Sequence, residues 1–219
     1  MNTINTYLKP LDFSKYFKRV VEWNATARGG KHDFSDKTLN KQKELVAEEI
    51  KELKEAIDAS DTVEVLDALC DIFVVASYYH FLQMNGELKD LSLKILTPLS
   101  GIDYYTSMIY DFETLDNGLM VTSDVCALLY QFNGFATAAL EEVLSSNDSK
   151  FPKVEKFGKQ KSKRELALNN ECAMIETRSE GRYSEVKWEI RGDRVVFLDG
   201  NGKIMKPFTF KSPNLKPFC

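Results

Sequence analysis

The sequence predicts a mainly α protein that ends in a small β-meander. Apolar residues recur at helical spacing through most of residues 13–145, and capping or turn-forming residues separate the periodic segments. From Tyr183 onward the pattern changes, because polar and apolar side chains alternate as they do in a half-buried strand. Together these observations indicate a helical body with a β appendage.

Five helices are expected in the first two thirds of the chain. They span residues 13–27, 38–58, 62–84, 104–115 and 121–145. Asp61 or Thr62 can cap the third helix, and the pair Asn85-Gly86 is typical of a helix end. Turns are expected at residues 28–36, 117–118, 145–152, 192–193 and 199–202.

Changes in composition and in hydrophobic periodicity divide the chain into three parts. Residues 1–150 are expected to form an all-α core, and residues 151–182 a polar, basic linker or extension. Residues 183–219 contain two alternating segments joined by turn residues, which predicts the β appendage.

Composition excludes several classes of protein. Apolar residues make up 43% of the 219 residues, so a true core is expected, and the net charge of −4 argues against nucleic-acid binding. We see no apolar run long enough to span a bilayer and no signal peptide. The four cysteines are scattered and there are two histidines, which disfavours a zinc site. A soluble cytoplasmic protein is expected.

Two acidic clusters carry most of the functional information. They read Glu48-Glu49-x-x-Glu52 and Glu64-x-x-Asp67-x-x-x-Asp71. Measured from Ser60 in the turn between their helices, Glu52 and Asp67 lie at nearly equal distances, and so do Glu49 and Asp71. Residues equally far from the turn of an antiparallel helix pair lie at the same height, so the clusters are expected to face each other. Such a group of carboxylates needs partners.

A divalent cation is the simplest partner for this group. Hard oxygen ligands without histidine or thiolate suit Mg²⁺, or Mn²⁺, and Mg²⁺ commonly meets a substrate phosphate. The alternative is an ordinary solvated helix face, which fits Glu44, Glu48 and Glu55 because Lys51 and Lys54 can pair with them.

A second polar segment could bind phosphate. Ser146, Asn147, Ser149 and Lys150 place hydroxyls, an amide and an ammonium within a short stretch. The alternative is a helix C-cap in which Asn147 adopts a left-handed conformation.

These motifs resemble the MazG-like all-α nucleoside triphosphate pyrophosphohydrolases, relatives of phosphoribosyl-ATP pyrophosphohydrolase. The resemblance covers residues 11–84, 120–150 and 200–217. The Asp67-Ala-Leu-x-Asp71 form, the 146–150 segment and the tail Gly202-Lys-Ile-Met-Lys-Pro207 are similar to a phage-encoded branch.

The resemblance implies a MazG-like helical bundle that cleaves a (deoxy)nucleoside triphosphate to the monophosphate and pyrophosphate with Mg²⁺. The metal ligands would be Glu49, Glu52, Asp67 and Asp71, with Glu64 an alternative to Asp71. Glu48 would be a further ligand or the base that orients water.

For the substrate, Ser146, Asn147, Ser149 and Lys150 would hold the phosphate tail. Trp23 and Asn24 would contact the base, although Trp23 could instead pack in the core.

The resemblance also implies a homodimer or homotetramer in the cytoplasm, which would be the host cytoplasm for a phage protein. Leu128, Leu129, Phe132 and Phe135 could supply the subunit surface or belong to the core. Two other functions stay open: a non-enzymatic helical module with an acidic docking face, and the phosphoribosyl-ATP reaction of histidine synthesis.

Overall fold

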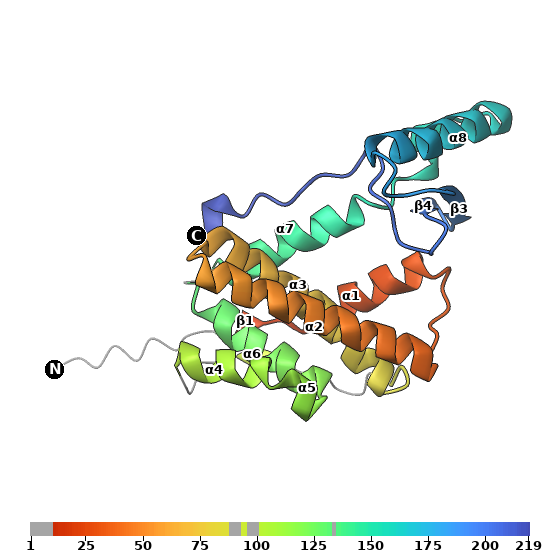
Figure 1. Cartoon of the computed structure of the whole chain (residues 1–219). Coiled ribbons are helices and arrows are strands. Elements are labelled where there is room, and N and C mark those ends of the chain that lie inside the picture. Colours follow the sequence, from red (N-terminus) through yellow and green to blue (C-terminus); the bar gives the residue numbers. More distant parts are fainter. Residues whose placement is uncertain (1–10, 88–92, 96–100, 133–134) are drawn as a thin grey trace, which may run out of the picture. The chain divides into compact units, whose positions relative to one another are not determined.

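The computed structural model describes residues 11–87, 93–95, 101–132 and 135–219. It is mainly helical with a small antiparallel sheet near the C-terminus, as the sequence predicts (Figure 1). The chain forms two compact units. Unit 1 comprises Met1–Val21, Asp33–Val143 and Asn214–Cys219, and unit 2 comprises Glu22–His32 and Leu144–Pro213. The three-part division expected at residues 150 and 182 stays a prediction.

The α-helices of the described residues occur in the following order along the chain. They are α1 (Ser14–Ala27), α2 (Asp36–Asp58), α3 (Thr62–Gln83), α4 (Ile102–Tyr110), α5 (Phe112–Leu115), α6 (Gly118–Tyr130), α7 (Ala136–Asp148) and α8 (Lys161–Arg178). Short 3₁₀ helices span Val154–Phe157 and Lys216–Phe218.

Helices α2 and α3 form the expected antiparallel hairpin in unit 1 and run side by side (Figure 1). The Asp61 side chain caps α3 by accepting hydrogen bonds from the N–H groups of Val63 and Glu64, at 3.1 and 3.2 Å. Ser60 makes the turn with a φ of 55°. This tight turn fixes the relative register of the two helices, which decides which side chains meet.

The apolar stripe of α2 packs inward, as its spacing predicts. Val46, Ile50 and Leu53 are buried, but Ile57 at the end of the stripe is 41% exposed. Along the same interface the Gln42 side chain donates a hydrogen bond to the Val75 carbonyl at 3.0 Å.

Helix α3 is the central core helix of unit 1. It is apolar on most sides and packs against both α2 and α6. Contrary to our expectation from the sequence, Thr62–Gln83 is long and apolar enough to cross a membrane; however, 67% of its most apolar window is buried within the protein. A core helix of a soluble protein explains this pattern. Cys70 and Cys126 are fully buried, as expected of small core residues.

Helix α6 approaches α3 closely at Gly118. A Cβ atom there would lie 2.8 Å from the backbone nitrogen of His80, so the first turn of α6 requires a residue without a side chain. The preceding Asn117 caps α6 by accepting a hydrogen bond from the Met120 N–H at 3.1 Å. Asn117-Gly118 therefore begins a helix, and the expected turn at this pair is wrong.

Two other expected helices are each divided. The segment 104–115 forms α4 and α5, which meet at Asp111. The segment 121–145 is not one helix, because α6 ends at Tyr130 and α7 begins at Ala136. Asn133-Gly134 between them is a turn-favouring pair in the sequence and lies outside the described residues.

Unit 1 also contains a small sheet and the end of the chain. Strand β1 (Leu11–Asp12) pairs with β2 (Lys94–Ile95) in antiparallel register. The C-terminal segment returns to this unit, where Leu215 is buried and the Asn214 N–H donates to the Glu142 carboxylate at 3.0 Å.

Unit 2 contains the second sheet. Strands β3 (Lys187–Arg191) and β4 (Arg194–Leu198) form a hairpin around the predicted turn at Gly192-Asp193. A bridge between Leu198 and Ile204 extends it beyond the second predicted turn.

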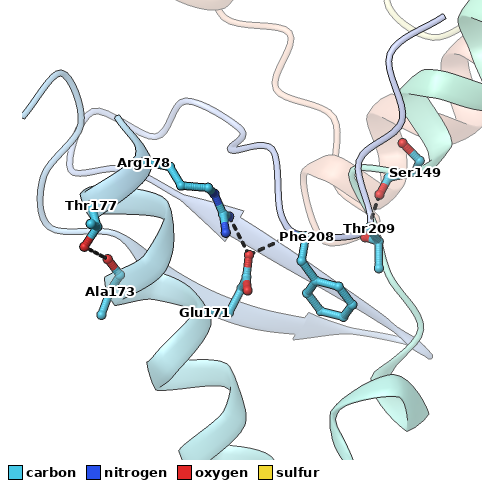
Figure 2. A network of polar contacts seen from close by, with 7 residues as sticks. All are labelled: Ser149, Glu171, Ala173, Thr177, Arg178, Phe208 and Thr209. Atoms are coloured by element: carbon cyan, nitrogen blue, oxygen red, sulfur yellow. Dashed lines mark hydrogen bonds and ion pairs between the residues drawn. The ribbon is translucent and has the colours of Figure 1, made fainter. Parts of the chain in front are cut away.

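The basic stretch before this hairpin contains α8, which helps to form the core of unit 2. That core comprises Phe157, Leu168, Cys172, Ile175, Val195, Phe197 and Met205. Figure 2 shows the hydrogen bonds that link the Glu171 carboxylate of α8 to the following chain. Glu171 accepts one hydrogen bond from the Arg178 side chain at 2.7 Å and one from the Phe208 N–H at 2.8 Å. Thr209 in turn donates to the Ser149 carbonyl at 2.9 Å.

Candidate functional site

The acidic residues of α2 and α3 converge around Glu49. Burial raises the pKa of Glu49 to about 8, and the charges of Asp71, Glu52, Asp67 and Glu48 add to this effect, in that order. Like charges raise the pKa of a carboxyl only when they lie near it. These five carboxylates therefore form one group, which we call the acidic cluster, on the facing sides of the two helices.

Within this cluster the residues differ in their exposure to solvent. Glu49, Asp67 and Asp71 are half-buried, whereas Glu48 and Glu52 are exposed. Glu64 lies near the turn and is exposed.

The other acidic residues of α2 behave as a solvated face. Lys51 pairs with Glu55 at 3.4 Å, and Lys41 pairs with Glu44 at 3.2 Å. Both pairs are exposed, so they contribute little to stability.

The chemistry of the cluster suits a hard divalent cation, because all of its donors are carboxylate oxygens. Among the described residues, no three acidic, histidine or cysteine side chains are arranged closely enough to hold a metal ion. The residue types fit Mg²⁺ or Mn²⁺, but binding would require the carboxylates to lie closer together than they do in this structure.

The predicted phosphate segment lies in unit 2 and its polar groups bond to one another. The Ser149 hydroxyl donates to the Ser146 carbonyl at 2.6 Å and accepts from the Lys211 N–H at 2.9 Å. The Lys150 ammonium donates to the Asn147 side chain at 2.7 Å. Asn147 lies inside α7, so the alternative of a left-handed C-cap at this residue is wrong.

Trp23 and Asn24, predicted to contact the base, also lie in unit 2. The Trp23 ring stacks on Phe151 with centroids 4.8 Å apart, and its buried indole N–H has no hydrogen-bond partner among the residues that the structure describes. Asn24 is 6% exposed and accepts a hydrogen bond from Arg28 at 2.5 Å. Packing therefore explains most of the Trp23 environment, and contact with the base stays a prediction.

Of the residues considered for a subunit surface, Leu128 and Leu129 are buried within unit 1. Phe132 is half-buried and Phe135 is 49% exposed. Only the two phenylalanines of this set offer apolar surface to another subunit.

A cavity in unit 1 was not predicted from the sequence. It has a volume of about 540 Å³ and lies between α2 and the α4–α5 segment. Its lining includes Glu48, Ile50, Lys51, Lys54, Tyr110 and Phe112. Glu48 belongs both to this cavity and to the acidic cluster. The two sides of the cavity are far apart in the sequence, so only the folded chain reveals it.

Comparison with known proteins finds a family match for the segment that contains the acidic cluster. Residues 18–94 match the family model of phosphoribosyl-ATP pyrophosphohydrolase. No curated protein and no solved structure matches the chain. The match spans α2 and α3 with all five cluster residues and does not reach residues 146–150.

The matched family is one of soluble, typically divalent-metal-dependent pyrophosphohydrolases, which are hydrolases acting on phosphoric anhydrides of nucleotides. Residues 18–94, about a third of the chain, are therefore similar to this family, which lies within the MazG-like all-α nucleoside triphosphate pyrophosphohydrolase superfamily.

Proposed function

We propose that the protein hydrolyses a (deoxy)nucleoside triphosphate to the monophosphate and pyrophosphate in a Mg²⁺-dependent reaction. One observation carries the proposal: five carboxylates from two antiparallel helices converge within the segment that matches the family. Such a cluster is costly to maintain without a function, because like charges in a partly buried site oppose one another.

In this proposal Glu49, Glu52, Asp67 and Asp71 hold the cation. When bound, Mg²⁺ would neutralise phosphate charge and lower the pKa of water. Glu48 is exposed at the edge of the cluster, where it can accept a proton from the attacking water. Asp67 and Asp71 both act on Glu49, which supports them as the pair that α3 contributes.

The substrate contacts of unit 2 are part of the same proposal. Ser146, Asn147, Ser149 and Lys150 would bind the phosphate tail, and Trp23 and Asn24 the base. Ser149 and Lys150 would first have to give up hydrogen bonds that they make within the protein. We also propose that the protein is a homodimer or homotetramer in the cytoplasm and that it belongs to the phage-type branch.

The experiment that tests the function is a nucleotide panel. Purified protein at micromolar concentration is incubated with canonical ribo- and deoxyribonucleoside triphosphates and phosphoribosyl-ATP, with Mg²⁺ or with EDTA, and pyrophosphate is measured. We expect release from at least one triphosphate with Mg²⁺ only. Release from phosphoribosyl-ATP alone would favour the histidine-pathway reaction, and release from none would favour an acidic docking module.

A further inference from the structure

The cavity between α2 and α4–α5 has the features of a nucleotide subsite. Its volume of about 540 Å³ lies within the range of roughly 300–1,000 Å³ that is typical of small-molecule sites. It lies wholly within unit 1, the unit that contains the acidic cluster. Glu48 lines the cavity and is one of the charges that act on Glu49, so the cavity and the cluster share one residue.

The cavity combines aromatic and apolar surface with positive charge. Ile50 and Phe112 are buried and Tyr110 is half-buried, so their contributions to the lining are largely rigid. The Lys54 ammonium lies over the Tyr110 ring, 4.4 Å from its centroid. A ring held beside an ammonium can stack on a nucleobase while the cation meets a phosphate.

The charged residues of α2 that line the cavity are ordered along the helix. Glu48, Lys51 and Lys54 are three residues apart, so they form one row along the helix surface. The row begins at the acidic cluster and continues past the aromatic side of the cavity. A nucleotide that lies along it would meet carboxylates at one end and ammonium groups at the other.

The negative charges of the cavity narrow the class of ligand. Glu44 and Glu113 also line it, and Glu44 already pairs with Lys41 at 3.2 Å. With both acids and lysines present, the lining is poorly suited to a free polyanion and better suited to a nucleotide whose charge is partly neutralised by a divalent cation.

We propose that this cavity, in place of Trp23 and Asn24, binds the nucleoside part of the substrate, with Tyr110 as the stacking residue and with Lys51 and Lys54, in place of residues 146–150, as phosphate contacts. The inference rests on the proposed function, because it places the substrate beside the cluster. It assigns specificity to α4 and α5, which lie outside the segment that matches the family.

The test measures nucleotide binding and turnover separately. Tyr110→Ala is compared with Tyr110→Phe and with the matched control Tyr104→Ala, which removes a 51% exposed tyrosine from the same helix. Binding of α,β-imido analogues of dUTP, dCTP and dGTP is measured by calorimetry with Mg²⁺. KM and kcat are measured with the triphosphate that the panel identifies.

We expect Tyr110→Ala to weaken binding of the preferred analogue and raise KM at least tenfold, with kcat within threefold of wild type. Tyr110→Phe and Tyr104→Ala should behave like wild type, and Lys54→Gln should weaken binding.

Unchanged binding in a folded Tyr110→Ala protein that still releases pyrophosphate would overturn the subsite and leave the proposed function intact. Weakened analogue binding without any pyrophosphate release would support the subsite and overturn the function. Absence of binding to every analogue by the wild-type protein would overturn the subsite; pyrophosphate release in that protein would then decide the function separately.

Discussion

The acidic hairpin of unit 1 and the 146–150 segment of unit 2 are both rich in polar groups, but they use them differently. In the 146–150 segment, hydroxyl, amide and ammonium groups bond to one another and to the backbone of residue 211. In the hairpin, carboxylates of the same sign face one another, and their repulsion acts on Glu49. Internal bonding explains the first set without a ligand, whereas we propose a cation as the partner of the second set. The predictions below test that contrast.

The largest effect is expected for Asp71→Asn. The substitution keeps the size of the side chain but removes a carboxylate that acts on Glu49, so pyrophosphate release should fall by about 10²–10³-fold or more. Helical content by circular dichroism should not change. Asp36→Asn, an exposed acid in the first turn of α2, is the matched control and should retain full activity. Full activity in Asp71→Asn would contradict cation binding by the cluster and would favour an ordinary solvated acidic face.

The pH dependence of stability should also reveal the cluster. Because the pKa of Glu49 rises on folding from the ordinary value of 4.5 to about 8, the folded state favours its protonated form. In EDTA the free energy of unfolding should therefore fall as pH rises through that window. Thermal melts at pH 5–8 measure this fall.

Two additions complete this experiment. Glu49→Gln should flatten the decrease, because it removes the titrating group. Mg²⁺ should raise the melting temperature most at pH 8, where the carboxylates are ionised. A melting temperature that Mg²⁺ leaves unaltered at pH 8 would count against cation binding.

A smaller effect is expected for Ser149→Ala. The hydroxyl makes two hydrogen bonds within unit 2, and each contributes about 1 kcal/mol to stability. A structural role predicts a lower melting temperature with KM unchanged, whereas phosphate binding predicts a higher KM. Denaturant unfolding and steady-state kinetics on the same samples separate these outcomes. A large increase in KM would indicate that the 146–150 segment, like the acidic hairpin, has a functional role.

Local signals in the sequence were sufficient to predict the hairpin of α2 and α3. The predicted ends of α2 and α3 lie within two residues of the observed ends, because a helical apolar pattern, the Asp61 cap and the turn at Ser60 act together. The convergence of Glu49 with Asp71 follows from their equal distances from that turn. In this region local preference and tertiary packing agree.

Other features depend on contacts that sequence spacing does not contain. In the segment 121–145 the helical spacing of apolar residues continues across the interruption after Tyr130. Periodicity alone therefore predicts one helix where the structure has two, α6 and α7. The bonds of Ser149 depend on Lys211, and the cavity depends on Tyr110 meeting α2. Such pairings are decided by tertiary structure and become visible only in coordinates.

The route of the chain has a practical consequence for anyone who divides this protein. Unit 1 draws on three separate stretches, and the last of them, with buried Leu215 and the Asn214–Glu142 hydrogen bond, arrives only after the whole of unit 2 has been traversed. No single cut yields both halves intact. A fragment that carries the acidic hairpin would need residues 214–219 restored, through a short bypass or as a separate peptide.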